Sequence, residues 1–167
     1  MIVDLVTTFG CRFEGKYEKP AAVVTFLKDY VDAGMKAVCL CDTIGIADPA
    51  QVKAVIQAVK AAYPELHLGV HFHDTRGLGM VNTLTAMEAG VDEIQSTLGG
   101  LGGCPFAPGA SGNLATEDAV WMLNEMGYDT GISFSKILAA AKHEKELIDG
   151  NYSGHHINIE NETPCKS

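Results

Sequence analysis

The sequence predicts an α/β protein in which short strands alternate with amphipathic helices. Three observations support this fold class: apolar, β-branched runs of strand length recur along the chain, a turn follows each run, and each turn leads into apolar residues at helical spacing. Consecutive strands joined through helices run parallel. We therefore expect a parallel sheet with helices packed on it.

The first two units follow this pattern closely. The first predicted strand covers residues 2–8 and leads, through a loop with Gly10 and Gly15, to a helix from about Pro20. The expected buried stripe of this helix is Val23, Phe26, Leu27, Tyr30 and Val31. The second predicted strand covers residues 37–41, and Asp48-Pro49 supplies an N-cap and a first-turn proline. The helix that follows is expected to bury Val52, Val55, Ile56 and Val59.

Two further units and a last helix complete the pattern. The third predicted strand covers residues 66–72 and the fourth residues 93–98, and a final helix is expected over residues 135–148. A helix is also predicted to begin near Thr116. The expected inward residues are Val81, Leu84 and Met87 after the third strand, Val120, Leu123 and Met126 after the fourth, and Ile137, Leu138, Ala141 and Ile148 in the last helix.

Four βα units fit either an open doubly wound sheet or part of a (β/α) barrel. A complete barrel has eight units and about 250 residues, whereas this chain has 167 residues. Barrel material of this length would be half of a barrel. We expect residues 1–150 to form that partial barrel domain and residues 151–167 to form a polar C-terminal tail.

Composition narrows the class of partner. The chain has 12 Lys+Arg and 21 Asp+Glu, so its formal net charge is −9, with 47% hydrophobic residues and a mean hydropathy of +0.09. An acidic surface repels nucleic-acid phosphates and anionic lipids, so neither is an expected partner. The hydrophobic fraction excludes intrinsic disorder, and no apolar run is long enough for a transmembrane helix.

The pattern of cysteines favours a reducing compartment. The five cysteines are an odd number at irregular spacings without a C-x-x-C pair, which argues against a disulfide framework or a structural zinc ribbon. Among common catalytic motifs, the phosphate-binding G-x-x-x-x-G-K-[ST], the dinucleotide G-x-G-x-x-G and the hydrolase G-x-S-x-G are all absent. The tandem His155-His156 near the C-terminus is expected to be an exposed pair.

Functional groups of parallel α/β folds gather after the carboxyl ends of the strands. At the end of the third predicted strand, His71 and His73 alternate with Phe72, so both imidazoles point to one side and can hold a metal. For the H-x-H pattern alone, a loop-capping histidine beside a core histidine is the alternative. Asp74 is expected to orient a ring or to cap the following turn.

A glycine-rich segment follows the fourth predicted strand. Residues 99–113 contain six glycines, which suggests a mobile lid or a loop whose backbone approaches a ligand closely. Cys104 lies in the middle of this segment, where a thiol can serve as acid, base or nucleophile. The alternative for Cys104 is a small residue that is merely tolerated.

Five stretches of the sequence carry a family resemblance: residues 9–11 (FGC), 14–16 (EGK), 42–45 (DTIG), 71–75 (HFHDT) and 99–118 (GGLGGCPFAPGASGNLATED). Together they resemble the hydroxymethylglutaryl-CoA lyase family. The resemblance runs from about residue 7 to about residue 141, and its last block is too long to arise by chance.

The resemblance implies a TIM (β/α)8-barrel enzyme that uses a divalent metal, Mg²⁺ or Mn²⁺, to cleave 3-hydroxy-3-methylglutaryl-CoA to acetyl-CoA and acetoacetate. By position, His71, His73 and Asn113 match the family's metal-binding residues, and Cys104 matches its catalytic cysteine. Asp42 matches an active-site aspartate.

The predicted roles follow from retro-aldol chemistry, in which a hydroxyl loses a proton and an enolate gains one. We expect Asp42 or His71 to take part in proton transfer and Cys104 to protonate the enolate. Thr43, beside Asp42, is predicted to contact the substrate. Glu117 and Asp118 open a helix, where capping is at least as good an explanation as catalysis.

The resemblance also implies that other family members carry an N-terminal half-barrel with an arginine and a metal-binding aspartate. This chain is expected to be the C-terminal half of the barrel, about four βα units and a C-terminal helix, with Met1 near the start of the family's fifth strand. Expected partners are an acyl-CoA substrate and either the N-terminal half-barrel or a second copy in a homo-oligomer, because half a barrel leaves open sheet edges.

Two other functions remain open. Claisen-type acyl-CoA synthases of the same superfamily share the strand-end H-x-H, although the cysteine loop favours the lyase. A catalytically inactive half-barrel is the non-enzymatic alternative. The compartment is expected to be cytoplasmic for a bacterial protein and mitochondrial for a eukaryotic one.

Overall fold

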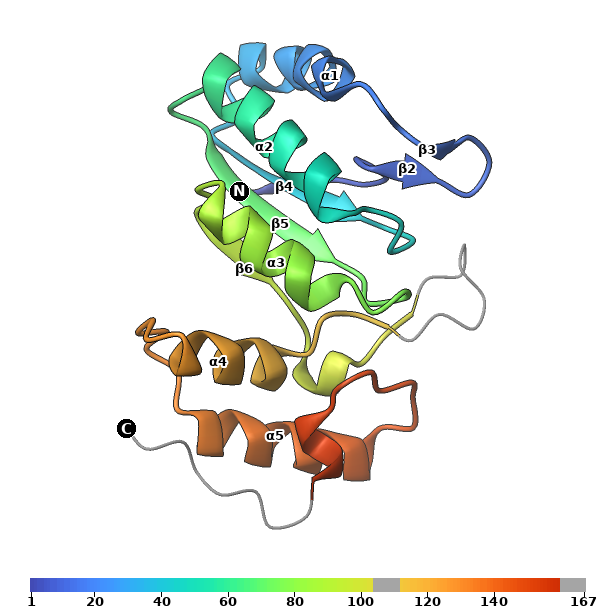
Figure 1. Cartoon of the computed structure of the whole chain (residues 1–167), viewed down its shortest axis with the longest axis vertical. Helices are drawn as coiled ribbons and strands as arrows, with labels where there is room; N and C mark the ends of the chain where they lie inside the picture. Colours follow the sequence, from blue (N-terminus) through green and yellow to red (C-terminus); the bar gives the residue numbers. More distant parts are fainter. Residues whose placement is uncertain (104–111, 160–167) are drawn as a thin grey trace. The chain divides into compact units, whose positions relative to one another are not determined.

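The computed structural model describes residues 1–103 and 112–159, and the chain forms two compact units (Figure 1). The first unit comprises Met1–Gln95 and the second Ser96–Ser167. Within the described residues, no helix is both long enough and apolar enough to span a bilayer.

The first unit contains a four-stranded, fully parallel sheet in the order β1-β4-β5-β6. Its strands are β1 (Val3–Leu5), β4 (Ala37–Asp42), β5 (His67–Phe72) and β6 (Glu93–Gln95). The alternation of parallel strands with helices confirms the predicted α/β class. The first and fourth strands are shorter than predicted, because the chain takes a positive φ of 56° at Thr7 and enters a 3₁₀ turn at Leu98.

Three helices cover one face of this sheet (Figure 1). They are α1 (Pro20–Asp32), α2 (Pro49–Ala62) and α3 (Gly79–Glu88). The strand residues buried against them alternate along the chain, as a pleated strand requires; they are Val38, Leu40, Leu68, Val70 and Phe72. The residues between them, including Cys39, Cys41 and His71, therefore belong to the opposite face of the sheet.

Helix α2 confirms the sequence prediction in detail. The Asp48 carboxylate accepts a hydrogen bond from the backbone N–H of Gln51 at 2.9 Å, and Pro49 opens the helix. This cap satisfies one of the amide groups that a helix start leaves unpaired. All four predicted residues of the stripe are buried, each stabilising the fold by about 1.5–3 kcal/mol; they are Val52, Val55, Ile56 and Val59.

Two of the predicted buried stripes are wrong in part. In α1, Phe26 is 55% exposed and stacks beside Tyr30 rather than entering the core. In α3, Val81 is exposed while the polar Asn82 is fully buried. Asn82 can be buried because its Nδ2 donates to the carbonyl of Ala47 at 3.0 Å, which replaces a bond to water.

A small antiparallel hairpin occupies the predicted loop after β1. Its strands are β2 (Gly10–Cys11) and β3 (Gly15–Lys16). The Gln51 side chain donates to the carbonyls of Phe9 and Tyr17, at 2.8 and 2.6 Å, and so ties both ends of the hairpin to α2.

The second unit consists of α4 (Thr116–Glu125), α5 (Phe134–Leu147) and the 3₁₀ turns η1 (Leu98–Gly100) and η2 (His156–Asn158). Its core contains Val120, Phe134, Leu138, Ala141 and Ile157. Both helices begin within one residue of their predicted positions. Met126 and Ile148, which were expected to be inward, are 45% and 47% exposed because they are the C-caps, where the helical stripe ends.

Candidate functional site

The two histidines at the end of β5 converge as the sequence predicts. The ring centroids of His71 and His73 are 5.2 Å apart, with an interplanar angle of 65°. Phe72, between them, points the other way: it is 1% exposed and its ring lies 5.9 Å from that of Phe9 in the core. The H-x-H pattern therefore places two imidazoles side by side at a carboxyl strand end.

His73 is held as a neutral imidazole. Burial, with a smaller contribution from the neighbouring His71, lowers its pKa to about 4. Its Nδ1 atom is buried and has no hydrogen-bond partner among the residues that the structure describes. A buried polar atom without a partner is costly, and such atoms are frequent where a ligand or metal binds.

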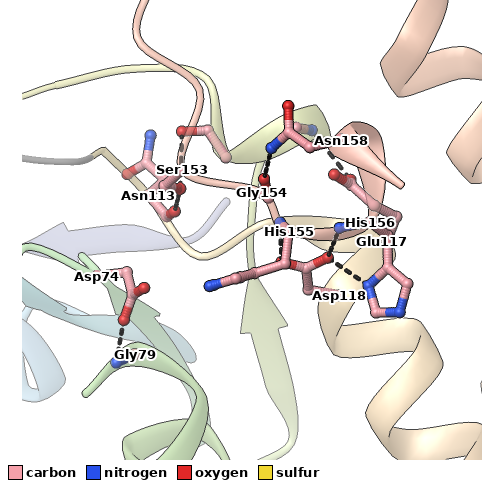
Figure 2. A network of polar contacts seen from close by, with 12 residues as sticks. Asp74, Gly79, Asn113, Glu117, Asp118, Ser153, Gly154, His155, His156 and Asn158 are labelled. Atoms are coloured by element: carbon pink, nitrogen blue, oxygen red, sulfur yellow. Dashed lines mark hydrogen bonds and ion pairs between the residues drawn. The ribbon is translucent and has the colours of Figure 1, made fainter. Parts of the chain in front are cut away.

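Asp74 caps the turn that follows the histidines. Its Oδ1 accepts the backbone N–H of Gly79 at 2.7 Å (Figure 2), and its carbonyl accepts the N–H of Gly77 at 3.0 Å. A Cβ on Gly79 would lie only 2.8 Å from that carboxylate oxygen, so the turn requires glycine there. The expectation that Asp74 caps this turn is confirmed.

Asp42, at the end of β4, anchors the loop that follows it. The carboxylate is 1% exposed, and its two oxygens accept the backbone N–H groups of Ile46 and Ala47 at 2.9 and 3.0 Å. Burial raises the pKa of Asp42, while those two hydrogen bonds oppose the shift. Strand pairing sets Asp42 beside Phe72, so alternation assigns it to the helix-covered face rather than to the face of His71.

The loop after β4 is also held by residues that sequence reasoning missed. The Arg76 guanidinium donates to the carbonyls of Ile44 and Gly45, both at 2.9 Å. Gly45 has a φ of +60°, and a Cβ there would lie 2.7 Å from Oγ1 of Thr75. Arginine near a histidine pair gives no sequence signal for this role, because both acceptors are backbone carbonyls about 30 residues away in the chain.

Thr43 binds the chain at the end of β1. Its hydroxyl accepts the backbone N–H of Thr7 at 2.8 Å. Thr7 has a positive φ of 56°, which is rare for a β-branched residue and concentrates at functional sites. The next residue, Thr8, donates its backbone N–H to the carbonyl of Cys41 at 3.1 Å. The ends of β1 and β4 are thereby joined.

In the second unit, Asn113 lies in a network of backbone contacts. Its Nδ2 donates to the carbonyl of Leu101 at 2.9 Å, and its own carbonyl accepts the Ser153 hydroxyl at 2.5 Å (Figure 2). Asn113 therefore binds Leu101 through its amide nitrogen. Its amide oxygen is the atom of this side chain that could bind a metal ion.

Glu117 and Asp118 hold neighbouring segments of the second unit. Glu117 is fully buried, and its Oε2 accepts the backbone N–H of Gly99 at 3.0 Å. Burial raises the pKa of Glu117. A Cβ on Gly154 would lie 2.6 Å from the other carboxylate oxygen, so this glycine lets the chain pass close to Glu117.

The tandem histidines differ from the expected exposed pair. The His155 side chain is 76% exposed, but that of His156 is only 12% exposed. Each oxygen of the Asp118 carboxylate meets the backbone N–H and the ring Nδ1 of one histidine (Figure 2). The His156 ring also lies 5.1 Å from Trp121 and 5.3 Å from Phe134. The sequence contains no local signal for a bond that spans 38 residues.

The predicted site residues fall in both units. His71, His73, Asp42 and Thr43 belong to the first unit, on the ends of neighbouring strands, and Asn113 belongs to the second. Cys104 lies outside the described residues. The first unit thus offers two converging imidazoles beside a loop held by Asp42 and Arg76, an arrangement able to bind a divalent cation.

Comparison with known proteins gives a consistent result. A family model described as HMGL-like matches residues 3–143. Hydroxymethylglutaryl-CoA lyase YngG of Bacillus subtilis is 44% identical over 144 residues, which is 86% of this chain and 48% of that protein. The mitochondrial hydroxymethylglutaryl-CoA lyase of Mus musculus is 47% identical over 131 residues, 78% of this chain and 40% of that protein. The chain therefore spans about half the length of these relatives, or less.

A solved structure matches the fold. The HMG-CoA lyase of Acinetobacter baumannii, in complex with coenzyme A and 3-methylmalate, superimposes with a TM-score of 0.85 at 39% identity. The match covers 99% of this chain and 54% of that one. The parallel sheet of βα units thus corresponds to part of a lyase of this type.

Proposed function

The chain belongs to the HMGL-like family, and we propose that it supplies part of the active site of a divalent-metal-dependent lyase that cleaves 3-hydroxy-3-methylglutaryl-CoA to acetyl-CoA and acetoacetate. The observation that carries this proposal is the convergent His71–His73 pair, in which the buried Nδ1 of His73 has no hydrogen-bond partner among the described residues. We further infer that residues 1–150 correspond to the C-terminal half of a (β/α)8 barrel and residues 151–167 to a C-terminal segment, of which Ile157 packs in the core of the second unit.

The residues fit a divalent cation. Imidazole nitrogens bind divalent metals, and an amide oxygen suits Mg²⁺ or Mn²⁺. The low pKa of His73 keeps that ring deprotonated and able to bind at neutral pH. His71, His73 and Asn113 would hold the ion. When bound, the cation would polarise the substrate's hydroxyl and a neighbouring oxygen.

Retro-aldol cleavage needs one proton removed from the tertiary hydroxyl and one delivered to the acetyl-CoA enolate. We assign the first transfer to His71 or Asp42 and the second to Cys104. Burial raises the pKa of Asp42, which is the direction expected of a carboxyl group that exchanges protons. Its two backbone hydrogen bonds favour a second contribution, which is to hold the loop around Thr43 in place for substrate contact.

The acyl-CoA substrate is supported by the relatives. The Acinetobacter baumannii enzyme binds coenzyme A together with 3-methylmalate, a small branched hydroxy acid. A glycine-rich segment next to Asn113 gives this chain a backbone that a ligand could approach closely. The further partner is either the remaining part of the barrel or a second copy of this chain.

Metal binding is the first test. Mn²⁺ titration followed by the loss of the free-ion EPR signal should show one site, weakened roughly tenfold or more in His73→Ala. His67→Ala is the matched control, since His67 lies on the same strand and its side chain is 46% exposed. Equal affinity in His73→Ala and the wild type would contradict the assigned ligand.

Activity is the second test. The chain, alone and mixed with the part of YngG that it does not match, is incubated with 3-hydroxy-3-methylglutaryl-CoA and Mn²⁺, and acetoacetate is measured with a coupled assay. Acetoacetate that forms in the wild type and is lost in Cys104→Ala supports the lyase. If the protein is folded and binds metal but neither sample forms acetoacetate, the result supports an inactive half-barrel. If the protein instead condenses acetyl-CoA with a 2-oxo acid, the result indicates a synthase.

A further inference from the structure

The sheet face that turns away from the helices carries a group of metal-binding side chains. Cys39 and Cys41 occupy alternate positions of β4, while Val38 and Leu40 between them are buried in the core with the helices. Strand pairing sets Asp4 of β1 directly beside Cys39. The two thiols and the carboxylate therefore share one face and lie on neighbouring strands.

The three ligand atoms are close together. The sulfurs of Cys39 and Cys41 and a carboxylate oxygen of Asp4 all lie within 4.8 Å of one another. A tetrahedral zinc ion with bonds of about 2.3 Å holds two sulfurs about 3.8 Å apart. Side-chain rotation that closes the group by about 1 Å would thus complete a three-ligand site. Both cysteines are free thiols and buried, whereas Asp4 is exposed.

The surroundings favour a cation at this position. A row across the sheet runs Asp4, Cys39, Gly69 and Glu93, each in register with the next. Gly69 has no side chain, and a Cβ there would lie 3.6 Å from the Cys39 sulfur and 3.5 Å from Cδ1 of Ile2, so the Ile2 side chain fills the space beside Cys39 that Gly69 leaves open. The Cys41 thiol, burial and the charges of Asp4 and Glu93 all raise the pKa of Cys39. The same negative charges that raise the pKa of the Cys39 thiol would attract a bound cation.

A disulfide between the two cysteines fits less well. Residues two apart on a strand have Cα atoms about 6.6 Å apart. This separation is at the upper end of the range that a disulfide tolerates, so the bond would be strained. Two neighbouring thiols beside a carboxylate are instead a donor set that selects soft or borderline metals over Mg²⁺.

We propose that Asp4, Cys39 and Cys41 form a binding site for a thiophilic divalent cation such as Zn²⁺, next to the His71–His73 pair, since Cys41 is in register with His71. When the ion binds, each thiol releases its S–H proton to solvent and forms a metal–sulfur bond. The Asp4 carboxylate supplies the third ligand and water the fourth. The exposed carboxylate provides the point of entry. This site does not depend on the proposed lyase activity.

Cobalt is the probe that tests the site. Co²⁺ bound to thiolates gives a sulfur-to-metal charge-transfer band in the near ultraviolet, which nitrogen and oxygen ligands do not produce. The full chain with Cys11, Cys104 and Cys165 changed to Ser retains only the two cysteines of β4. We expect this protein to bind one Co²⁺ with that band, to release protons, and to lose the band on addition of Zn²⁺.

Variants distinguish the proposed site from other binding. Cys39→Ser and Cys41→Ser should each abolish or strongly reduce the band, whereas His73→Ala should leave it unchanged. Asp4→Asn, at an exposed position that should not affect folding, should weaken binding roughly tenfold or more, since even indirect partners of metal ligands have effects of that size. Asp29→Asn, exposed on α1, is the matched control and should bind normally.

Two results would overturn the proposal. One is a folded protein, verified by circular dichroism, that shows no sulfur-to-cobalt band at saturating metal. The other is a band whose intensity and Co²⁺ affinity are unchanged both in the Asp4→Asn variant and in one of the two cysteine variants. That result would place the metal elsewhere.

Discussion

His156 donates both its backbone N–H and its ring Nδ1–H to one oxygen of Asp118, at 3.0 and 2.6 Å. Asp118 lies in the first turn of α4, and His156 opens η2 near the end of the described chain. Burial would raise the pKa of Asp118, but the backbone and ring donors of the two histidines outweigh it, so the pKa is lowered. The residues around η2 are thereby bound to the second unit's core.

The first prediction compares the two histidines. His156→Ala should lower the free energy of unfolding of the second unit by about 2–3 kcal/mol, because it removes a charge-assisted hydrogen bond and a buried ring. His155→Ala is the matched control and should cost about 1 kcal/mol or less, since that ring is 76% exposed. Urea unfolding monitored by Trp121, the only tryptophan, reports on this unit. Equal losses in the two variants would contradict the assignment.

The second prediction is acid sensitivity of the same unit. The pKa of Asp118 is lower in the folded state than its usual value near 3.9, so the unfolded state binds more protons over this interval. Its stabilisation is therefore present above the usual value and is lost as the pH falls from about 5 through the folded pKa. Asp118→Asn should be less stable at pH 7 and should lose less stability on acidification. Trp121 fluorescence during an acid titration measures both effects.

The third prediction concerns His73 in the first unit. Its pKa is about 4 when folded and near 6.5 when unfolded, so stability should fall as the pH drops from about 6.5 to 4 in metal-free buffer. His73→Gln should remove this part of the pH dependence. Thermal unfolding followed by far-ultraviolet circular dichroism at several pH values provides the test. If stability depends on pH equally steeply in the wild type and in His73→Gln, His73 is not the source of this pH dependence.

The fourth prediction separates backbone strain from steric overlap. Gly45 and Gly77 have similar positive φ values, +60° and +70°. A Cβ on Gly45 would meet Thr75 at 2.7 Å, whereas nothing lies within 4 Å of a Cβ on Gly77. Both Ala variants should lose about 1 kcal/mol through strain. Gly45→Ala should lose a further ~1–3 kcal/mol through overlap, and a chemical denaturation curve for each gives the difference.

The fifth prediction tests Asp42 as a loop anchor. Asp42→Asn keeps one acceptor but turns an NH₂ group toward a backbone N–H, leaving a buried donor unpaired. We expect a loss of about 1–3 kcal/mol in unfolding free energy, even with no substrate or metal present. Asp29→Asn, at an exposed position, should be neutral. A stable Asp42→Asn protein would argue that the two hydrogen bonds to Ile46 and Ala47 contribute little.

The sequence by itself determined the features that depend on local periodicity. The alternation of strands and helices, the Asp48-Pro49 start of α2 and the shared face of His71 and His73 each follow from residues a few positions apart. The cap by Asp74 is local in the same sense. These predictions needed no knowledge of which strands pair.

Only the tertiary structure decided which polar groups are buried with partners. Asn82, rather than Val81, is buried in the core because its side-chain amide donates a hydrogen bond to the Ala47 carbonyl. His156 is buried because Asp118 accepts its hydrogen bonds. The Asp4–Cys39–Cys41 group likewise exists only through the register of β1 on β4. For Asn82 and His156 the physical reason is the same: a buried polar group is stable only with a partner, and these partners lie 35 and 38 residues away in the chain.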